Sequence, residues 1–264
     1  MARVSATSPG AAAPLIHLSN VRKVYRIGGS EFVAVSDVTF DIFEGDLVSL
    51  VGPSGCGKTT VLKILAGLHD ADGGRVEIGE GHGEFVPGRD VGMVFQQPLL
   101  LKWRTVLENV LLPAQILKLN LKQAEERAHE LLEMVGLAGS ETRYPYELSG
   151  GMQQRAAIAR ALVHDPKLVL MDEPFGALDA ITRERMNLEM LRIWAQSGKT
   201  FVFVTHSIQE AVFLGSRCAV LTSGPARMAD FFAIDLPLPR TLELKTQEHF
   251  GELTKRVYRQ LGMA

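Results

Sequence analysis

The segment Gly52–Thr60, which reads GPSGCGKTT, constrains the fold of this chain more than any other stretch. It matches the pattern G-x-x-x-x-G-K-[ST], and it lies between an apolar run, DLVSLV, and a segment with helical spacing, KTTVLKILAGL. In that strand–loop–helix context the pattern predicts a P-loop, in which glycines let backbone N–H groups surround phosphate oxygens. The start of the helix adds a positive dipole end. The residues expected to hold phosphate are Gly52, Pro53, Ser54, Gly55, Cys56, Gly57, Lys58, Thr59 and Thr60.

The rest of the chain extends this unit into an α/β fold with a parallel sheet. Apolar runs at residues 167–171, 200–205 and 218–222 have the length of buried strands, and helical segments separate them. Such alternation favours a parallel sheet covered on both faces. Residues 15–48 alternate instead, which predicts an N-terminal antiparallel β subdomain with a turn at Gly28-Gly29.

No strand is predicted between Trp103 and about Leu162. Apolar residues there follow 3–4 spacing, so we expect a helical insertion at about 103–162, in which Pro113 breaks or kinks the first helix. The expected organisation is a mobile N-terminal tail over 1–14, one domain over 15–240 that contains the insertion, and a C-terminal helical tail over 241–264.

Composition excludes several classes of protein. The 28 Lys and Arg residues are balanced by 30 Asp and Glu, so the basic footprint of a nucleic-acid-binding protein is missing and no nucleic-acid partner is expected. No apolar run approaches the roughly 18 residues of a membrane span, and the first residues lack the apolar centre of a secretory signal. The two cysteines are not spaced as a zinc site or a disulfide framework, which fits a reducing compartment.

Polar residues of the types that act as metal ligands or as acids and bases lie at the ends of the predicted strands. LVLMDE places Asp172 and Glu173 after a buried strand; alone this is more often a solvated turn, but beside a P-loop Asp172 fits a Mg²⁺ ligand and Glu173 a general base. His206, in FVTHS, also ends a strand, where a lone histidine is usually structural. Gln96, in VFQQP, has on composition alone the character of a loop residue.

A second glycine-rich segment lies far from the first. Leu148–Gly151 reads LSGG and precedes a helix, so Ser149, Gly150 and Gly151 offer the chemistry of another phosphate nest. The alternative interpretation is a flexible helix start.

In this order, the P-loop, VFQQP, LSGGMQQR, LVLMDEP, GALDA and VTHS closely resemble the ATPase subunit of ATP-binding cassette (ABC) transporters, from about Leu15 to about Ala226. The resemblance implies ATP and Mg²⁺ as ligands. It implies that Tyr25 stacks on adenine, that Lys58 and Thr60 bind phosphate, that Thr59, Gln96 and Asp172 contact Mg²⁺, and that Glu173 and His206 join Lys58 and Gln96 in catalysis.

The resemblance also implies that LSGG acts between subunits. In this family two subunits pack head to tail, and Ser149, Gly150 and Gly151 of one cover the γ-phosphate bound by the other, while Asp179 crosses to the partner. Such an interface is isologous and closes as a two-fold pair. The other expected partners are integral membrane permease subunits and, indirectly, a substrate-binding protein, with the chain peripheral on the cytoplasmic face of the inner membrane.

Two segments resemble one branch of the family. LLLKWRTVLENV (Leu99–Val110) and TQEHFGELTKRVYRQL near the C-terminus are similar to importer subunits for nitrate, sulfonate, taurine and related nutrients, although Lys102 stands where those have proline. Sugar and methionine importer ATPases usually have an added C-terminal regulatory domain, which we do not expect here because few residues follow the cassette. Because the ATPase does not touch the cargo, the cargo is poorly encoded.

Two alternatives to a transport ATPase stay open. One is a soluble ABC ATPase that acts on nucleic acid or ribosomes, which usually has two cassettes or a long coiled coil after the P-loop; the other is a module that senses ATP without hydrolysing it. The single cassette disfavours the first, and intact Glu173 and His206 disfavour the second.

Two side chains carry further expectations. Cys56 lies beside a helix N-terminus and near Lys58, which favours a reactive thiolate, unless it is simply small enough for the loop. Trp103 follows Gln96 closely and is expected at the membrane partner, with a core position in the insertion as the alternative.

Overall fold

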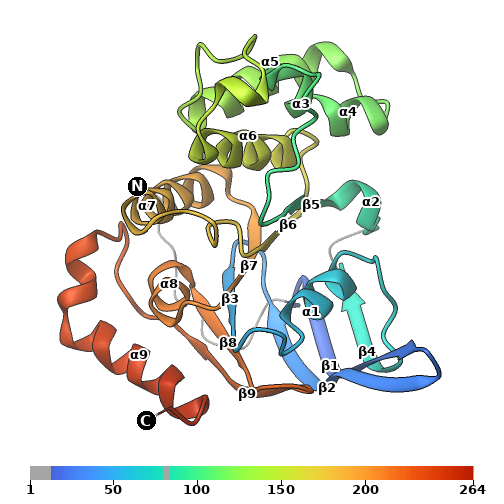
Figure 1. Cartoon of the computed structure of the whole chain (residues 1–264), viewed down its shortest axis with the longest axis vertical. Coiled ribbons are helices and arrows are strands. Elements are labelled where there is room, and N and C mark those ends of the chain that lie inside the picture. The colour runs from blue at the N-terminus through green and yellow to red at the C-terminus, as the bar shows by residue number, and fades with distance from the viewer. Residues whose placement is uncertain (1–12, 80–83, 264) are drawn as a thin grey trace.

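The computed structural model describes residues 13–79 and 84–263, and one mixed sheet runs through it (Figure 1). Residues 1–12, most of the predicted N-terminal tail, lie outside the described residues. The strand order is β4-β1-β2-β9-β8-β3-β7-β6-β5. The strands are β1 (Ile16–Ile27), β2 (Ser30–Ile42), β3 (Leu47–Val51), β4 (Gly73–Ile78), β5 (Val91–Val94), β6 (Leu168–Asp172), β7 (Thr200–Thr205), β8 (Arg217–Leu221) and β9 (Ala226–Ala233).

The core of the sheet is parallel, as the apolar runs predicted. β8, β3, β7, β6 and β5 pair in parallel, each with its neighbour. Successive side chains of a strand point to opposite faces. In β3, Val48 and Leu50 join the apolar cluster that contains the buried side of the first helix, whereas Leu47 and Val51 join the cluster on the other face. Both faces of the parallel strands are therefore buried, which explains their uninterrupted apolar sequences.

The N-terminal strands form the predicted antiparallel subdomain. β1 pairs antiparallel with β2 and with β4, and Gly28 and Gly29 turn the chain between β1 and β2 with φ of 56° and 83°. The sequence pattern does not predict β4 or β9, whose residues are mostly half-buried. β9 is antiparallel to β8 and parallel to β2, so it joins the subdomain to the core in one sheet.

Helices cover both faces and form a separate lobe between β5 and β6. Their bounds are α1 (Lys58–Leu65), α2 (Pro87–Asp90), α3 (Val106–Val110), α4 (Leu112–Ile116), α5 (Leu121–Met134), α6 (Gly150–Leu162), α7 (Ala180–Ser197), α8 (Ile208–Leu214) and α9 (Glu248–Gln260), with 3₁₀ turns at Pro145–Glu147 and Leu242–Thr246. Figure 1 shows α3 to α6 as a helical lobe above the sheet. Pro113 lies in the first turn of α4, so the helix is interrupted after Val110, as predicted.

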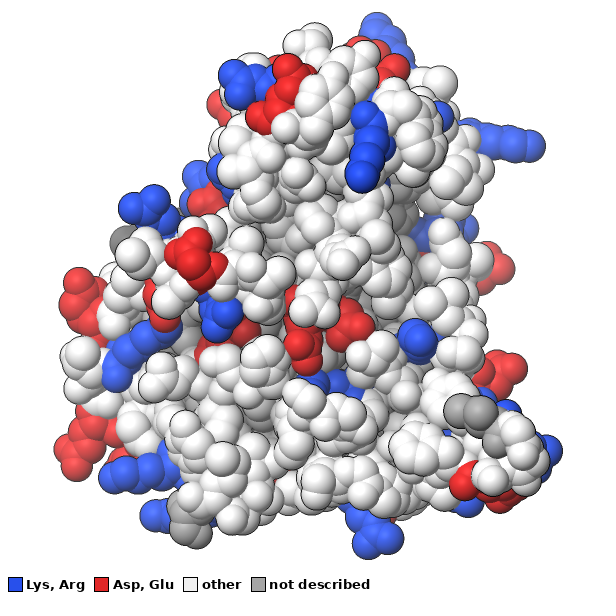
Figure 2. Space-filling model, in the orientation of Figure 1, with Lys and Arg blue, Asp and Glu red and all other residues white. Residues whose placement is uncertain are grey.

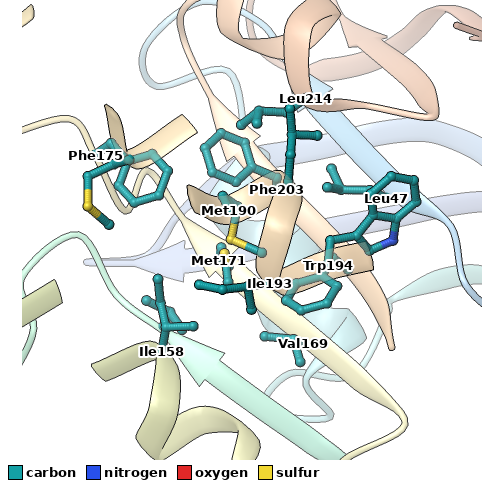
Figure 3. Packing of buried hydrophobic residues seen from close by; sticks show 14 of the residues in the cluster. Leu47, Ile158, Val169, Met171, Phe175, Met190, Ile193, Trp194, Phe203 and Leu214 are labelled. Carbon is teal, nitrogen blue, oxygen red and sulfur yellow. The ribbon is translucent and has the colours of Figure 1, made fainter. Parts of the chain in front are cut away.

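The helical lobe is tied to the core by packing and by hydrogen bonds from α6. In Figure 3, Ile158 of α6 lies near Met171 of β6, Met190 of α7 lies beside Phe203 of β7, and Trp194 of α7 lies beside Leu47 of β3. Gln154 of α6 donates to the Phe95 carbonyl at 3.1 Å. Arg160 of the same helix donates to the carbonyls of Pro98 and Leu99. Side chains of α6 therefore hold the backbone of the segment that follows β5.

The C-terminal segment packs against α7 and α8. Lys245 bonds Glu184 of α7 and lies over the ring of Phe213 of α8, and α9 buries Phe250, Leu253 and Val257. Within the described part of the chain, no helix has both the length and the apolar character that crossing a bilayer requires.

Candidate active site

The P-loop has a backbone that only glycine accommodates at two points. Gly57 caps α1 with φ of 112°, and a Cβ there would lie 2.6 Å from the Ala34 carbonyl oxygen. A Cβ on Gly52 would lie 2.6 Å from the carbonyl oxygen of Leu221. Because both clashes are with backbone, neither position tolerates a side chain without a shift of the loop. The loop connects β3 to α1, as the pattern predicted.

Lys58 lies inside the loop rather than on the surface. Its side chain is 4% exposed, and its ammonium donates to the carbonyls of Gly52 at 2.9 Å and Pro53 at 3.0 Å. The same ammonium is 3.7 Å from Glu173 Oε1. The loop thus holds a cation at the N-terminus of α1, where phosphate oxygens bind in a P-loop.

Thr59 and Asp172 meet although 113 positions separate them. The Thr59 hydroxyl donates to Asp172 Oδ1 at 3.2 Å, which joins the first turn of α1 to the end of β6. Burial raises the pKa of Asp172, and the Thr59 hydrogen bond opposes that rise. A hydroxyl and a carboxylate are oxygen donors of the kind that Mg²⁺ prefers, together with water and substrate phosphates. The residues present fit Mg²⁺.

Glu173 is held at the centre of this group. It follows β6 in the left-handed region, with φ of 46°, and its N–H donates to the Val204 carbonyl of β7. Its Oε2 lies 3.0 Å from Nδ1 of His206, which follows β7. A carboxylate fixed by its backbone and by a histidine has the geometry of an oriented general base.

Gln96 approaches the same group from the end of β5. Its side chain is exposed, and a Cβ built on Gly176 would lie 3.2 Å from Gln96 Nε2 and 3.7 Å from Glu173 Oε2. The ends of β3, β5, β6 and β7 therefore bring Lys58, Gln96, Asp172, Glu173 and His206 to one edge of the sheet, where parallel sheets gather their ligands.

The LSGG segment is not part of this group. Ser149 caps α6 by accepting from the Met152 N–H, and Figure 1 shows α6 in the helical lobe, apart from α1 in the body below. Ser149 and Gly151 instead line a hollow of about 330 Å³ between α6 and α7. Asp179 caps α7 beside it, and hydrogen bonds from the Thr182 hydroxyl and N–H hold the pKa of Asp179 below its usual range.

Tyr25 lies on β1, half-buried. Its ring meets the His69 ring edge-on at 5.7 Å between centroids, and Lys23 Nζ lies 5.9 Å from the Tyr25 centroid. No contact between Tyr25 and the P-loop is seen in the described part of the chain, so its role toward adenine stays a prediction.

The structure corrects one expectation and decides another. The Cys56 side chain points into the apolar cluster around α1 and is 1% exposed, and burial raises the pKa of its thiol. The expectation of a reactive thiolate is therefore wrong, because desolvation outweighs the nearby Lys58 charge. Trp103 is 74% exposed, so the core alternative for this residue is wrong.

Sequence reasoning missed Arg183, which organises the loop that leads to Asp179. From the first turns of α7 its guanidinium donates to the carbonyls of Phe175 at 3.3 Å and Leu178 at 2.9 Å. One cation thus holds the GALDA turn in shape. Its helical position, four residues after Asp179, gave no signal, because an arginine on a helix is usually solvated.

The chain is similar to known proteins in sequence and in structure. The chain matches the family model described as ABC transporter over residues 35–176. It is 40% identical over 245 residues to the aliphatic sulfonates import ATP-binding protein SsuB of Bacillus cereus, covering 93% of this chain and 95% of that one. It is 42% identical over 241 residues to the nitrate import ATP-binding protein NrtC of Synechococcus elongatus, covering 89% of this chain and 36% of that longer one.

Among solved structures, the chain resembles the ATP-binding cassette MJ0796 in its dimeric post-hydrolysis state bound to ADP and Pi. The TM-score is 0.70 at 34% identity, over 84% of this chain and all of that one.

Proposed function

The chain belongs to the ABC transporter family as an ATP-hydrolysing subunit of the import type. From this premise we propose that two copies close around two ATP molecules to drive import of a small nutrient, such as nitrate, a sulfonate or taurine, through a separate membrane permease. The observation that carries the proposal is the convergence of Lys58, Asp172, Glu173 and His206 at one sheet edge while LSGG lies in another lobe.

Each residue at the sheet edge has a distinct part in the proposed reaction. The P-loop N–H groups and Lys58 hold the β- and γ-phosphates, Thr59 and Asp172 with Gln96 hold Mg²⁺, and Glu173 accepts the proton of the attacking water. Bound Mg²⁺ neutralises charge on the phosphate oxygens. His206 keeps the Glu173 carboxylate in place through the 3.0 Å contact. Phosphoryl transfer needs mainly such positioning and charge compensation.

The second phosphate contact comes from a second copy of the chain. Ser149, Gly150 and Gly151 present hydroxyl and N–H groups at the start of α6, and a P-loop from a partner supplies the phosphate that they cover. Asp179 caps α7 beside the same hollow, so a partner chain that covers the hollow would also contact Asp179. ATP then joins the two copies, and hydrolysis separates them. The dimeric state of the solved relative supports this arrangement.

The permease contact lies on the surface that follows Gln96. Trp103 and Leu99 are 74% and 55% exposed, and large apolar side chains at a surface favour a protein partner. Arg160 of α6 binds the backbone of this segment. Movement of the helical lobe would therefore shift the surface around Leu99 and Trp103 that faces the permease. The names of the relatives favour sulfonate or nitrate as cargo, with taurine as a chemically related sulfonate.

The permease proposal is tested in membranes that contain the permease subunits and this chain. ATP-dependent uptake of a sulfonate, of nitrate and of taurine is measured beside basal ATPase activity. We expect uptake of one of them. ATPase activity that rises with ribosomes or nucleic acid, and not with the permease, would instead support the soluble alternative. The face in Figure 2 disfavours that outcome, since its Lys and Arg side chains are interleaved with Asp and Glu.

Trp103→Ala tests the contact surface. Because Trp103 is exposed and outside the core, the variant should keep its melting temperature and basal ATPase activity but lose permease-dependent uptake about tenfold or more, as expected for an interface anchor. Equal loss of uptake and basal activity with a lower melting temperature would contradict the interface role.

A further inference from the structure

We propose that Glu210 is a positioning residue for hydrolysis, which holds the turn that carries His206 through the hydroxyl of Thr205. Neither the family resemblance nor the motif order assigns Glu210 a part. The inference rests on the proposed roles of Glu173 and His206.

Three hydrogen bonds close a ring around His206. The Ser207 N–H donates to Thr205 Oγ1 at 3.0 Å, the Thr205 hydroxyl donates to Glu210 Oε2, and the Glu210 N–H donates to Ser207 Oγ at 3.3 Å. The ring spans the turn from β7 to α8, and His206 is the residue between its two hydroxyl members.

The ring is an extended form of a helix capping box. In a capping box the third helical residue, here Glu210, bonds the N–H of the capping residue, here Ser207. In this chain the Thr205 hydroxyl stands between them, and it both accepts from the N–H and donates to the carboxylate. The insertion of Thr205 fixes the backbone on both sides of His206.

The members of the ring and the histidine that they frame differ in exposure. Thr205 and Glu210 are 2% and 6% exposed, whereas the side chain of His206 is 48% exposed. The ring fixes the backbone of His206, and with it the direction of its Cα–Cβ bond, so that the imidazole reaches Glu173 with Nδ1 at 3.0 Å.

Stability alone does not explain why a carboxylate is buried at Glu210. Its Oε1 has no hydrogen-bond partner in the described structure, and burial raises the pKa of the group. The positive groups that act on it are Arg183, His206 and Lys245, and Arg183 and Lys245 bond the Asp179 loop and Glu184 respectively. A buried carboxylate with an unpaired oxygen lowers stability. Groups that cost stability are expected where they serve function.

The first measurement compares Glu210→Ala in two backgrounds. We expect kcat for ATP hydrolysis to fall about 10- to 100-fold, since a misplacement of about 1 Å can cost on the order of 10²-fold in rate. KM for ATP should change less than about twofold, because the P-loop is untouched. In a His206→Ala background the same substitution should change kcat less than about twofold, because there is no imidazole left to position.

Further variants separate positioning from folding. Thr205→Ser keeps the hydroxyl and should retain most of the wild-type kcat, whereas Thr205→Val should behave like Glu210→Ala. The pair Thr205→Val with Glu210→Leu removes both side chains of the buried bond and leaves only the Ser207 N–H without its acceptor, so the melting temperature should fall less than in Glu210→Ala while kcat stays low. Asn120→Ala is the matched control, because it removes the side-chain cap of α5 in the helical lobe and should lower the melting temperature without changing kcat.

Each outcome is decisive. If Glu210→Ala lowers kcat equally in both backgrounds, or if the Thr205→Val with Glu210→Leu pair regains wild-type kcat, Glu210 serves the fold alone and the positioning role is overturned, while the proposed function stands. If His206→Ala by itself leaves kcat unchanged, the proposed role of His206 fails and the positioning role fails with it.

Discussion

The two glycine-rich segments look alike in sequence but differ in the space that the chain leaves for a side chain at each glycine. In the P-loop, Gly52 and Gly57 each lie against backbone, where a Cβ would approach a carbonyl oxygen to 2.6 Å. In the LSGG segment, a Cβ on Gly150 would meet nothing within 4 Å, and one on Gly151 would make only an ordinary 3.5 Å contact with Thr182.

This difference supports the proposal that the second segment acts on a partner chain. Glycine is less favourable than alanine in a helix, and Gly150 and Gly151 in the first turn of α6 relieve no internal clash. No contact within the chain explains why two glycines stand here. The close approach of another molecule to their backbone would explain them. The fold of the chain itself requires the P-loop glycines but not the LSGG glycines, which supports the proposed contact of LSGG with a partner chain.

Glu173→Gln should give the largest effect, because it removes the base and keeps both glycine segments. Loss of a general base costs about 10²–10⁴-fold in rate, so hydrolysis should become slow while ATP still binds. If LSGG closes over the γ-phosphate of the partner, the unhydrolysed ATP should hold a dimer, visible by size-exclusion chromatography with MgATP. Near-normal turnover would remove Glu173 from this role.

Lys58→Ala and Gly151→Asp separate the two segments by binding. Removing a charge-assisted phosphate bond costs about 1.5–3 kcal/mol, so Lys58→Ala should weaken ATP binding by the single chain about 10- to 150-fold. Gly151→Asp should leave that affinity unchanged and prevent dimer closure, since a carboxylate would face the γ-phosphate.

A mixture of the two variants provides the control. One site of the mixed dimer combines the intact P-loop of the Gly151→Asp chain with the intact LSGG of the Lys58→Ala chain. That site should occlude labelled MgATP although neither variant does so alone. If Gly151→Asp weakens binding by the single chain as much as Lys58→Ala does, LSGG serves its own chain.

Alanine substitutions test the glycines themselves. Gly57→Ala should lower the free energy of unfolding by about 1 kcal/mol or more, because φ is 112° there and the Ala34 carbonyl blocks the side chain. Gly150→Ala should raise it by about 0.4–1 kcal/mol and still reduce ATPase activity. Urea unfolding of the nucleotide-free chain measures both, and a destabilised Gly150→Ala would erase the contrast.

Thiol labelling should have the smallest effect on ATPase activity, and it compares the accessibility of the P-loop directly with that of the LSGG segment. Cys56 is buried and burial raises the pKa of its thiol, so a bulky maleimide should label it slowly through neutral pH, with little loss of ATPase activity. Gly150→Cys adds a thiol at an exposed position, which should label rapidly and be protected by MgATP when the dimer closes. Fast labelling of Cys56 in the unmodified chain would contradict its burial.

The sequence alone determined the elements whose signal is local. A P-loop needs glycine at fixed offsets between a strand and a helix, and buried parallel strands need continuous apolar runs, so both were predictable from residues 47–65 and from the later runs. The interruption of the helix at Pro113 is local as well, because proline lacks the N–H that a helix requires. The positions of Asp172, Glu173 and His206 at strand ends follow from the same patterns.

Only the tertiary structure decided the features that depend on residues far apart in the chain. β9 joins the antiparallel subdomain to the parallel core through partners in β2 and β8, and its mixed polarity gives no signal by itself. Cys56 was expected to be reactive from its neighbours in the sequence, but residues of distant strands bury its thiol. The hydrogen bond between Thr205 and Glu210 could not be predicted from their spacing. It depends on the burial of both side chains, which residues from other parts of the chain provide. Local patterns set backbone geometry, but burial and its effect on charge are properties of the packed chain.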